Sequence, residues 1–300
     1  MIKLNKITRN YELYLILLPG IVYYVVFHYL PMYGVTLAFK DFRASLGILG
    51  SPWVGLRHFH RFFDSFQFWT LIRNTIGISV YQLLVGFPVP ILLALMLNEV
   101  RHLRFKKVVQ TVTYAPHFIS TVVMVGMLVV FLSPSGGMIN VLIKALGGRP
   151  INFLAESHLF KTIFVVSGVW QSAGFASIIY VSVLASIDPE LHEAATIDGA
   201  TRVQRIWHIN VPGLTPTIVI LLILNVGRIM SVGFEKVFLM QNPLNLVSSE
   251  VISTYVYKVG ILGGEFSFST AVGFFNSVIN LILLVTVNRV AKTVSATSLW

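Results

Sequence analysis

Six polar or amphipathic side chains in the later apolar stretches of this 300-residue sequence are candidates for lining a cavity. Polar groups in such stretches are costly to bury in lipid, so we expect them to face a cavity or a neighbouring helix. A carboxamide donates and accepts hydrogen bonds, an indole offers an apolar face, and a guanidinium pairs with carboxylates. These candidate pathway residues are Trp170, Gln171, Asn225, Arg228, Asn276 and Asn280. The alternative is that they hydrogen-bond between helices, at about 0.6 kcal/mol for each bond.

Arg228 is the one charged residue of this set. Counted along a helix it stands roughly 24 Å beyond Pro212, near the outer end of a predicted span. It either extends to the outer lipid headgroups or pairs with a carboxylate, on a solute or on a partner subunit.

The sequence lacks the motifs of common catalytic sites. There is no G-x-x-x-x-G-K-[ST] phosphate loop, so we expect the chain not to hydrolyse ATP and any energy to come from a partner. There is no G-x-S-x-G or H-E-x-x-H motif and no cysteine, and His58 and His60 are interpreted as surface side chains. Acidic residues mostly flank the apolar stretches, which argues against an ion-coupling carboxylate. We therefore expect no catalytic residue, metal or cofactor in this chain.

Composition indicates a polytopic membrane protein. Hydrophobic residues make up 55% of the chain and charged residues 11%, with a mean hydropathy of +0.78, which is too apolar for a soluble domain of this length. The formal charge of +10 does not indicate nucleic-acid binding, because the basic residues are spread over short loops, as membrane orientation requires.

The apolar runs predict one all-α transmembrane domain over residues 1–300, with six helices long enough to cross a bilayer. The predicted spans are residues 13–39, 74–98, 108–132, 162–187, 212–232 and 270–288. The first run is long and no small-residue cleavage site follows it, so it is interpreted as a retained span rather than a signal peptide. The basic leader 1–12 and the basic loop 99–107 place both termini in the cytoplasm, although the basic residues of the first outer loop oppose this orientation.

The polar segment 188–211 carries clear helix signals and lies between the fourth and fifth spans. Asp188 and Pro189 suit an N-cap and first helical position, and Gly199 suits the left-handed conformation that closes a helix. Thr201 and Gln204 form a capping-box pattern, so a second helix should begin there and end or kink at Pro212. We expect two short cytoplasmic helices joined at a glycine elbow.

One face of the first of these helices is small enough for close approach of another protein. The candidate docking residues are Glu193, Ala194, Ala195, Asp198, Gly199 and Ala200. The alternative is an ordinary capped loop without a partner.

A family resemblance favours docking. E-A-A-x-x-x-G from Glu193 to Gly199, followed by I-x-x-P from Ile209 to Pro212, resembles the EAA loop of the membrane subunits of ATP-binding-cassette importers. Val211 stands where the family pattern has leucine. The segment D-P-E-L-H-E-A-A-T-I-D-G-A resembles the sugar-importer branch, and G-L-R-H-F from Gly55 and F-W-T-L-I-R-N-T from Phe68 extend the likeness. The most similar branch handles oligosaccharides and polysaccharides, including alginate-type acidic glycans.

The resemblance implies a permease subunit in the cytoplasmic membrane. Its implied partners are a second, homologous permease, two cytoplasmic ATPase subunits that bind ATP and Mg²⁺, and an extracytoplasmic solute-binding protein. The docking residues would then occupy a cleft of one ATPase, and the later spans would line the sugar path. The other interpretations are a permease of this architecture for a non-sugar solute, and an ion-coupled carrier or channel that works without an ATPase.

Overall fold

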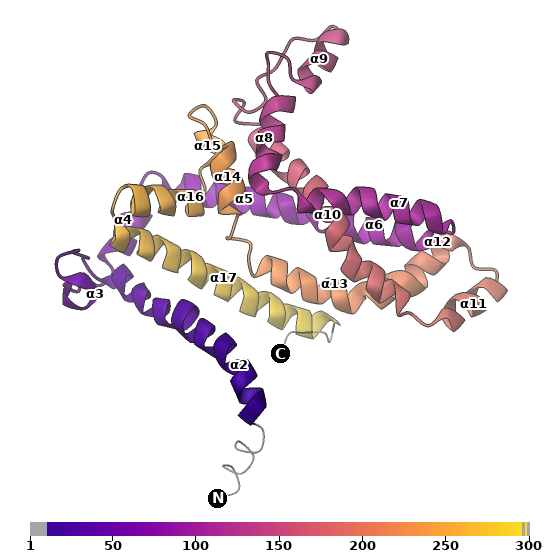
Figure 1. Cartoon of the computed structure of the whole chain (residues 1–300), viewed down its shortest axis with the longest axis horizontal. Coiled ribbons are helices and arrows are strands. Elements are labelled where there is room, and N and C mark those ends of the chain that lie inside the picture. Colours follow the sequence, from indigo (N-terminus) through magenta and orange to yellow (C-terminus); the bar gives the residue numbers. More distant parts are fainter. Residues whose placement is uncertain (1–10, 296–297, 299–300) are drawn as a thin grey trace, which may run out of the picture. The chain divides into compact units, whose positions relative to one another are not determined.

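The structure is a computed structural model that describes residues 11–295 and residue 298 (Figure 1). These residues are almost all helical, and their one β-bridge joins Lys40 to Trp53. Five helices are long and apolar enough to span a membrane, and a bent pair of helices brings the number to six. The prediction of an all-α membrane fold is confirmed. Most of the predicted basic leader, residues 1–10, lies outside the described residues.

The chain divides into two compact units, and the first comprises residues 1–65 and 256–275. Its helical segments are α2 (Tyr11–Tyr24), η1 (Val25–Tyr29), η2 (Leu30–Phe39), α3 (Gly47–Gly50), α4 (Arg57–Phe63), η5 (Tyr257–Leu262) and the beginning of α17 (Phe266–Ser295). Phe62 is fully buried and packs edge-on against Phe268 and Phe275. None of the residues of α2 is buried, which suits a helix that meets lipid or another subunit.

The second unit comprises residues 66–255 and 276–300 and is built around α10 (Phe160–Ala185). Its other segments are α5 (Phe68–Gly86), α6 (Pro88–Glu99), α7 (Leu103–Tyr114), η3 (Ala115–Phe118), α8 (Thr121–Phe131), α9 (Met138–Ala145), α11 (Pro189–Ile197), α12 (Arg202–Arg205), η4 (Ile206–Asn210), α13 (Val211–Val226), α14 (Phe234–Met240), α15 (Leu246–Ser249), α16 (Ile252–Val256) and the remainder of α17. Helix α10 packs against α5, α6 and α13 (Figure 1).

The second span begins earlier than predicted. The sequence predicted that this span starts at residue 74, whereas the structure has the short α4 and then starts α5 at Phe68. Together α5 and α6 form one spanning helix, Phe68–Glu99. Helix α5 gives way to α6 at Pro88, because proline is tolerated at a first helical position.

The third predicted span, residues 108–132, is not one straight helix. Two helical segments, Leu103–Phe118 and Thr121–Phe131, meet at a bend of 100°. Ser120 starts α8 as an N-cap, because its hydroxyl accepts a hydrogen bond from Val123 N at 3.3 Å. Gln171 of α10 donates to the Ile119 carbonyl at 2.8 Å and so satisfies an acceptor that the break leaves free.

The fifth span differs from the prediction at both ends. Pro212 does not end a helix, because α12, η4 and α13 form one helix, Arg202–Val226. A wider π-helical turn at Ile206–Asn210 precedes the proline, which then lies in the first turn of α13, where a missing N–H costs little. At its C-terminal end α13 stops at Val226, whereas the predicted span ended at residue 232.

Candidate functional site

The segment between α10 and α13 is held by the local caps that the sequence predicts. Asp188 Oδ1 accepts from Glu190 N at 3.0 Å, which starts α11, and Gly199 has φ = 76°. Ala200 N donates to Ala195 O at 2.9 Å across this glycine. Thr201 and Gln204 form the reciprocal capping box. The predicted helix start, glycine elbow and second helix start are confirmed, and α12 then continues directly into the fifth span.

The six candidate docking residues lie together on α11 and its elbow. Glu193, Ala194, Asp198 and Gly199 are exposed, and Ala195 and Ala200 are half-buried. The carboxylates of Glu193 and Asp198 make no hydrogen bond or ion pair with the described residues, so both remain free for another protein. Glu193 also lines an open hollow that contains Arg101, Arg202 and Arg205.

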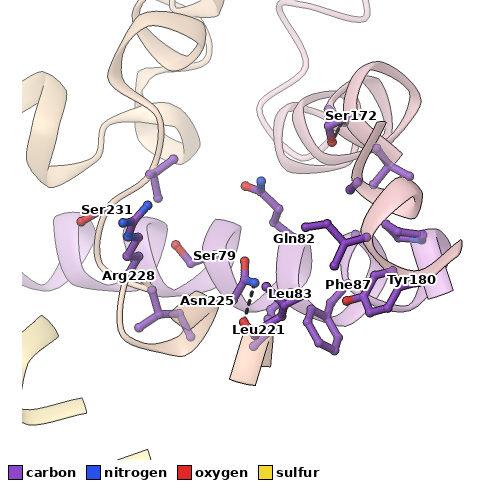
Figure 2. Close-up of a pocket in the computed structure, with 18 residues that line it drawn as sticks. Ser79, Gln82, Leu83, Phe87, Ser172, Tyr180, Leu221, Asn225, Arg228 and Ser231 are labelled. Atoms are coloured by element: carbon purple, nitrogen blue, oxygen red, sulfur yellow. Dashed lines mark hydrogen bonds between the residues drawn. The ribbon is translucent and has the colours of Figure 1, made fainter. Parts of the chain in front are cut away.

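A cavity of about 420 Å³ opens between α5, α6, α10, α13 and the turn that follows α13 (Figure 2). Its polar lining comprises Ser79, Gln82, Ser172, Tyr180, Asn225, Arg228 and Ser231. Apolar side chains, among them Leu83, Phe87 and Leu221, form the rest of the wall. This volume and this mixture of apolar wall and few polar groups are typical of a small-molecule site.

Several of the polar groups in this cavity are free to bind a solute. Asn225 donates one N–H to Leu221 O of its own helix at 2.7 Å, as the dashed line in Figure 2 shows. The side chains of Ser79, Gln82 and Arg228 have no hydrogen-bond or ion-pair partner among the described residues. The cavity therefore presents carboxamides and a hydroxyl together with one uncompensated guanidinium.

Arg228 lies in a turn and not on a helical span as predicted. Residues 227–230 form hydrogen-bonded turns directly after α13. Asn280 of α17 holds this turn, because its amide accepts from Met230 N at 3.0 Å and donates to Ser231 Oγ at 2.9 Å. Gly227 permits the close approach of α17, since a Cβ there would lie 2.5 Å from Leu284 Cδ1.

The structure brings two of the six candidate pathway residues into the cavity, Asn225 and Arg228. The other four lie outside its lining. Trp170 is half exposed on α10, Gln171 holds the break before α8, and Asn280 holds the turn that carries Arg228. Asn276 is half-buried, and its Oδ1 has no partner among the described residues.

Comparison with known proteins identifies the family. Residues 86–296 match the family described as the binding-protein-dependent transport system inner membrane component. The chain belongs to this family. It is therefore a membrane permease component of a transporter that works with a solute-binding protein, as the resemblance of its loop predicted.

Three similar proteins share most of the permease's length. It is 46% identical to the polygalacturonan/rhamnogalacturonan transport system permease protein YteP of Bacillus subtilis (strain 168), over 96% of this chain and 90% of the relative. It is 41% identical to a chain of a bacterial alginate transporter in complex with an alginate pentasaccharide-bound periplasmic protein, with a TM-score of 0.91 over 98% of this chain and 99% of that one. A second structure, of an importer of the acidic polysaccharide alginate, gives a TM-score of 0.92 and 41% identity over 98% and 100% of the two chains.

Sequence reasoning missed Ser79, Gln82 and Ser172 as lining residues of the permease's cavity. Gln82 carries the same signal as Asn225, because it is a carboxamide inside a long apolar run. Ser172 donates to Gly168 O of its own helix, as serines in helices commonly do, so its residue type alone carries little signal. Among the described residues no group of three or more His, Asp or Glu side chains could hold a metal ion.

Proposed function

We propose that the permease imports an acidic oligosaccharide or polysaccharide across the cytoplasmic membrane, driven by ATP hydrolysis on separate subunits. The observation that carries this proposal is the uncompensated guanidinium of Arg228 in a cavity whose other free groups are hydrogen-bonding. A guanidinium is always charged and its planar fork matches a carboxylate. Gln82 and Asn225 suit sugar hydroxyls, and the ring of Phe87 suits the apolar face of a sugar.

The relatives support an acidic cargo. The similar protein from Bacillus subtilis is named for polygalacturonan and rhamnogalacturonan, and the two similar structures are of alginate transporters. Galacturonate and alginate units each carry a carboxylate on a hydroxyl-rich ring. A cavity with one unpaired cation and several neutral hydrogen-bonding groups is suited to such a unit.

Coupling to ATP hydrolysis is proposed through α11 and its elbow. The residues that would dock in a cleft of one of two cytoplasmic ATPase subunits are Glu193, Ala194, Ala195, Asp198, Gly199 and Ala200. Because the helix that begins at Arg202 continues to Val226, a displacement of the loop would reach Asn225 and the Arg228 turn through one rigid element. A second, homologous permease would complete the pathway, and both termini of the chain would lie in the cytoplasm.

Reconstitution tests this function. The permease is purified with its partner permease, ATPase subunits and binding protein, placed in liposomes, and supplied with an oligogalacturonate, an oligomannuronate or a neutral maltooligosaccharide. We expect the uronate oligomers to stimulate ATP hydrolysis and to enter the liposomes, whereas the neutral oligomer should do neither. Stimulation by the neutral oligomer alone would contradict the acidic cargo. Uptake that persists without ATP, driven by an ion gradient, would contradict the ATP-driven mechanism.

A further inference from the structure

Lys236 on α14 is a buried cation without a carboxylate partner. Its side chain is 9% exposed, and no described acidic group forms an ion pair with it. The ammonium donates to the Phe164 carbonyl at 2.6 Å and lies 4.5 Å from the centre of the Phe164 ring. A buried ammonium is expensive unless it is paired, so its presence calls for a reason.

The fold does not need this ammonium to satisfy the Phe164 carbonyl. Phe164 lies within the continuous helix α10, where the residue four positions later supplies the usual donor. Ser167 Oγ donates mainly to Ile163 O, at 2.5 Å, and lies 3.2 Å from the Phe164 oxygen as a weaker second contact. Burial lowers the pKa of Lys236 to about 8, so the side chain still carries its charge in most molecules at neutral pH.

The position of Lys236 provides a reason, because the ammonium lies next to a residue that lines the cavity. A Cβ built on Gly168 would stand 3.1 Å from Lys236 Nζ, and Gly168 itself lines the cavity. Val232, four residues before Lys236, lines it as well. At Gly168 no side chain separates the charge from a bound solute, and a charge acts over a longer range where water is excluded.

We propose that Lys236 is a specificity-determining residue, which supplies a second positive charge to the cavity through the glycine wall at Gly168 and acts with Arg228 to favour acidic oligosaccharides. This inference rests on the proposed acidic cargo and adds a residue that is not part of the cavity lining. Arg228 can bind a carboxylate directly, whereas Lys236 acts on the solute only through the electric field of its charge beside Gly168.

The same arrangement recurs at the beginning of α10. Lys161 Nζ lies 2.8 Å from the place of a Cβ on Gly77, and Lys161 has no ion-pair partner among the described residues. Lys161 precedes Gly168 by seven residues, roughly 10 Å along the helix. Gly77 precedes the lining residue Ser79 on α5. Lys161 on α10 and Arg228 in the turn after α13 are thus further cations without an ion-pair partner on segments that border the cavity.

The test compares one sugar chain with and without its charge. The complete importer in liposomes is given an oligogalacturonate and the same oligomer as its methyl ester, and kcat and KM for uptake are measured for each. The Lys236→Met variant keeps a long apolar stem and removes the charge. We expect its kcat/KM for the acid to fall at least about fivefold while that for the ester stays within about twofold of wild type. The matched control is Lys144→Met, which removes an exposed lysine on α9 and should change neither value.

Other outcomes would overturn the proposal. If Lys236→Met lowers kcat/KM equally for acid and ester, or for neither, Lys236 does not select charge. The proposed function would still stand in that case, provided that the wild type takes up the acid. If wild type transports only the ester, the proposed acidic cargo fails and this inference fails with it. If Lys236→Met does not assemble with its partners, Lys236→Gln serves as a second uncharged variant that can still donate to Phe164 O. Failure of both to assemble would make Lys236 a structural residue.

Discussion

The segment from Asp188 to Gln204 and the cavity around Arg228 are built in different ways. In the loop, the capping hydrogen bonds at the helix ends join residues no more than five positions apart, and the carboxylates of Glu193 and Asp198 remain available to a partner. The cavity takes its lining from residues 79 to 232, and its cation, Arg228, has no ion-pair partner among the described residues. The loop can therefore keep its shape while it moves, whereas the cavity depends on how four helices and a turn are held together.

The largest effect is expected at the docking face. We expect the Glu193 carboxylate to meet a cation of the ATPase. Glu193→Lys would place a second cation opposite it, and like charges at a desolvated contact can cost several kcal/mol. The ATPase subunits should then be lost when the permease is purified from membranes. Glu190→Lys, an exposed residue of the same helix, is the matched control and should retain them. Glu193→Gln separates the loss of the carboxylate from repulsion by the nearby Arg101, Arg202 and Arg205. An intact complex with Glu193→Lys would place docking on another face.

The next largest effect is expected at the elbow. Gly199 has φ = 76°, and no atom lies within 4 Å of an added Cβ, so a substitution there acts through the backbone and not through a clash. Gly199→Val forces a β-branched residue into a conformation it rarely adopts and should abolish both substrate-stimulated ATP hydrolysis and uptake. Gly199→Asn should retain most of both, because asparagine tolerates this conformation. Equal activity of the two variants in liposomes would remove the elbow from the coupling mechanism.

In the cavity we expect a smaller effect that depends on the cargo. Arg228→Gln should reduce uptake of a uronate oligomer about tenfold, which corresponds to roughly 1.4 kcal/mol for one charge-assisted contact. Uptake of the methyl-esterified oligomer should change little. Arg149→Gln, which removes an exposed arginine outside the cavity, is the control. Equal losses for both oligomers, with less assembled complex, would show that Arg228 holds subunits together and would remove the main support for an acidic cargo.

The smallest effect concerns stability and follows from the burial of Lys236. Its pKa falls from 10.5 to about 8 in the folded chain, so between these values the folded state binds fewer protons than the unfolded state. Stability should therefore rise with pH across that window, and the penalty is complete below about pH 8. Lys236→Met removes this penalty but also loses the hydrogen bond to Phe164 O, so the melting temperature of the purified complex at pH 7 should rise only slightly. The gain should shrink towards pH 10. A gain that does not change with pH would show that it comes from packing.

The helix ends of the loop could be read from the sequence because they depend on neighbours in the chain. Asp188, Gly199 and the Thr201–Gln204 pair each act over a few residues, so the residue types in that order suffice. The number of spans followed in the same way from the length of the apolar runs. These features need no knowledge of which helix packs against which.

Tertiary structure decided the features that depend on distant partners. The bend before α8 relies on Gln171 from another helix, and the early end of α13 relies on Asn280 and on the close approach of Leu284 to Gly227. A carboxamide in an apolar run has the same sequence signature whether it faces a cavity, as Asn225 does, or holds a turn, as Asn280 does. Likewise, the sequence around Lys236 does not predict that this side chain is buried. It is buried because it contacts Phe164 of α10. Its burial is set by contacts across more than 70 positions, which no local pattern encodes.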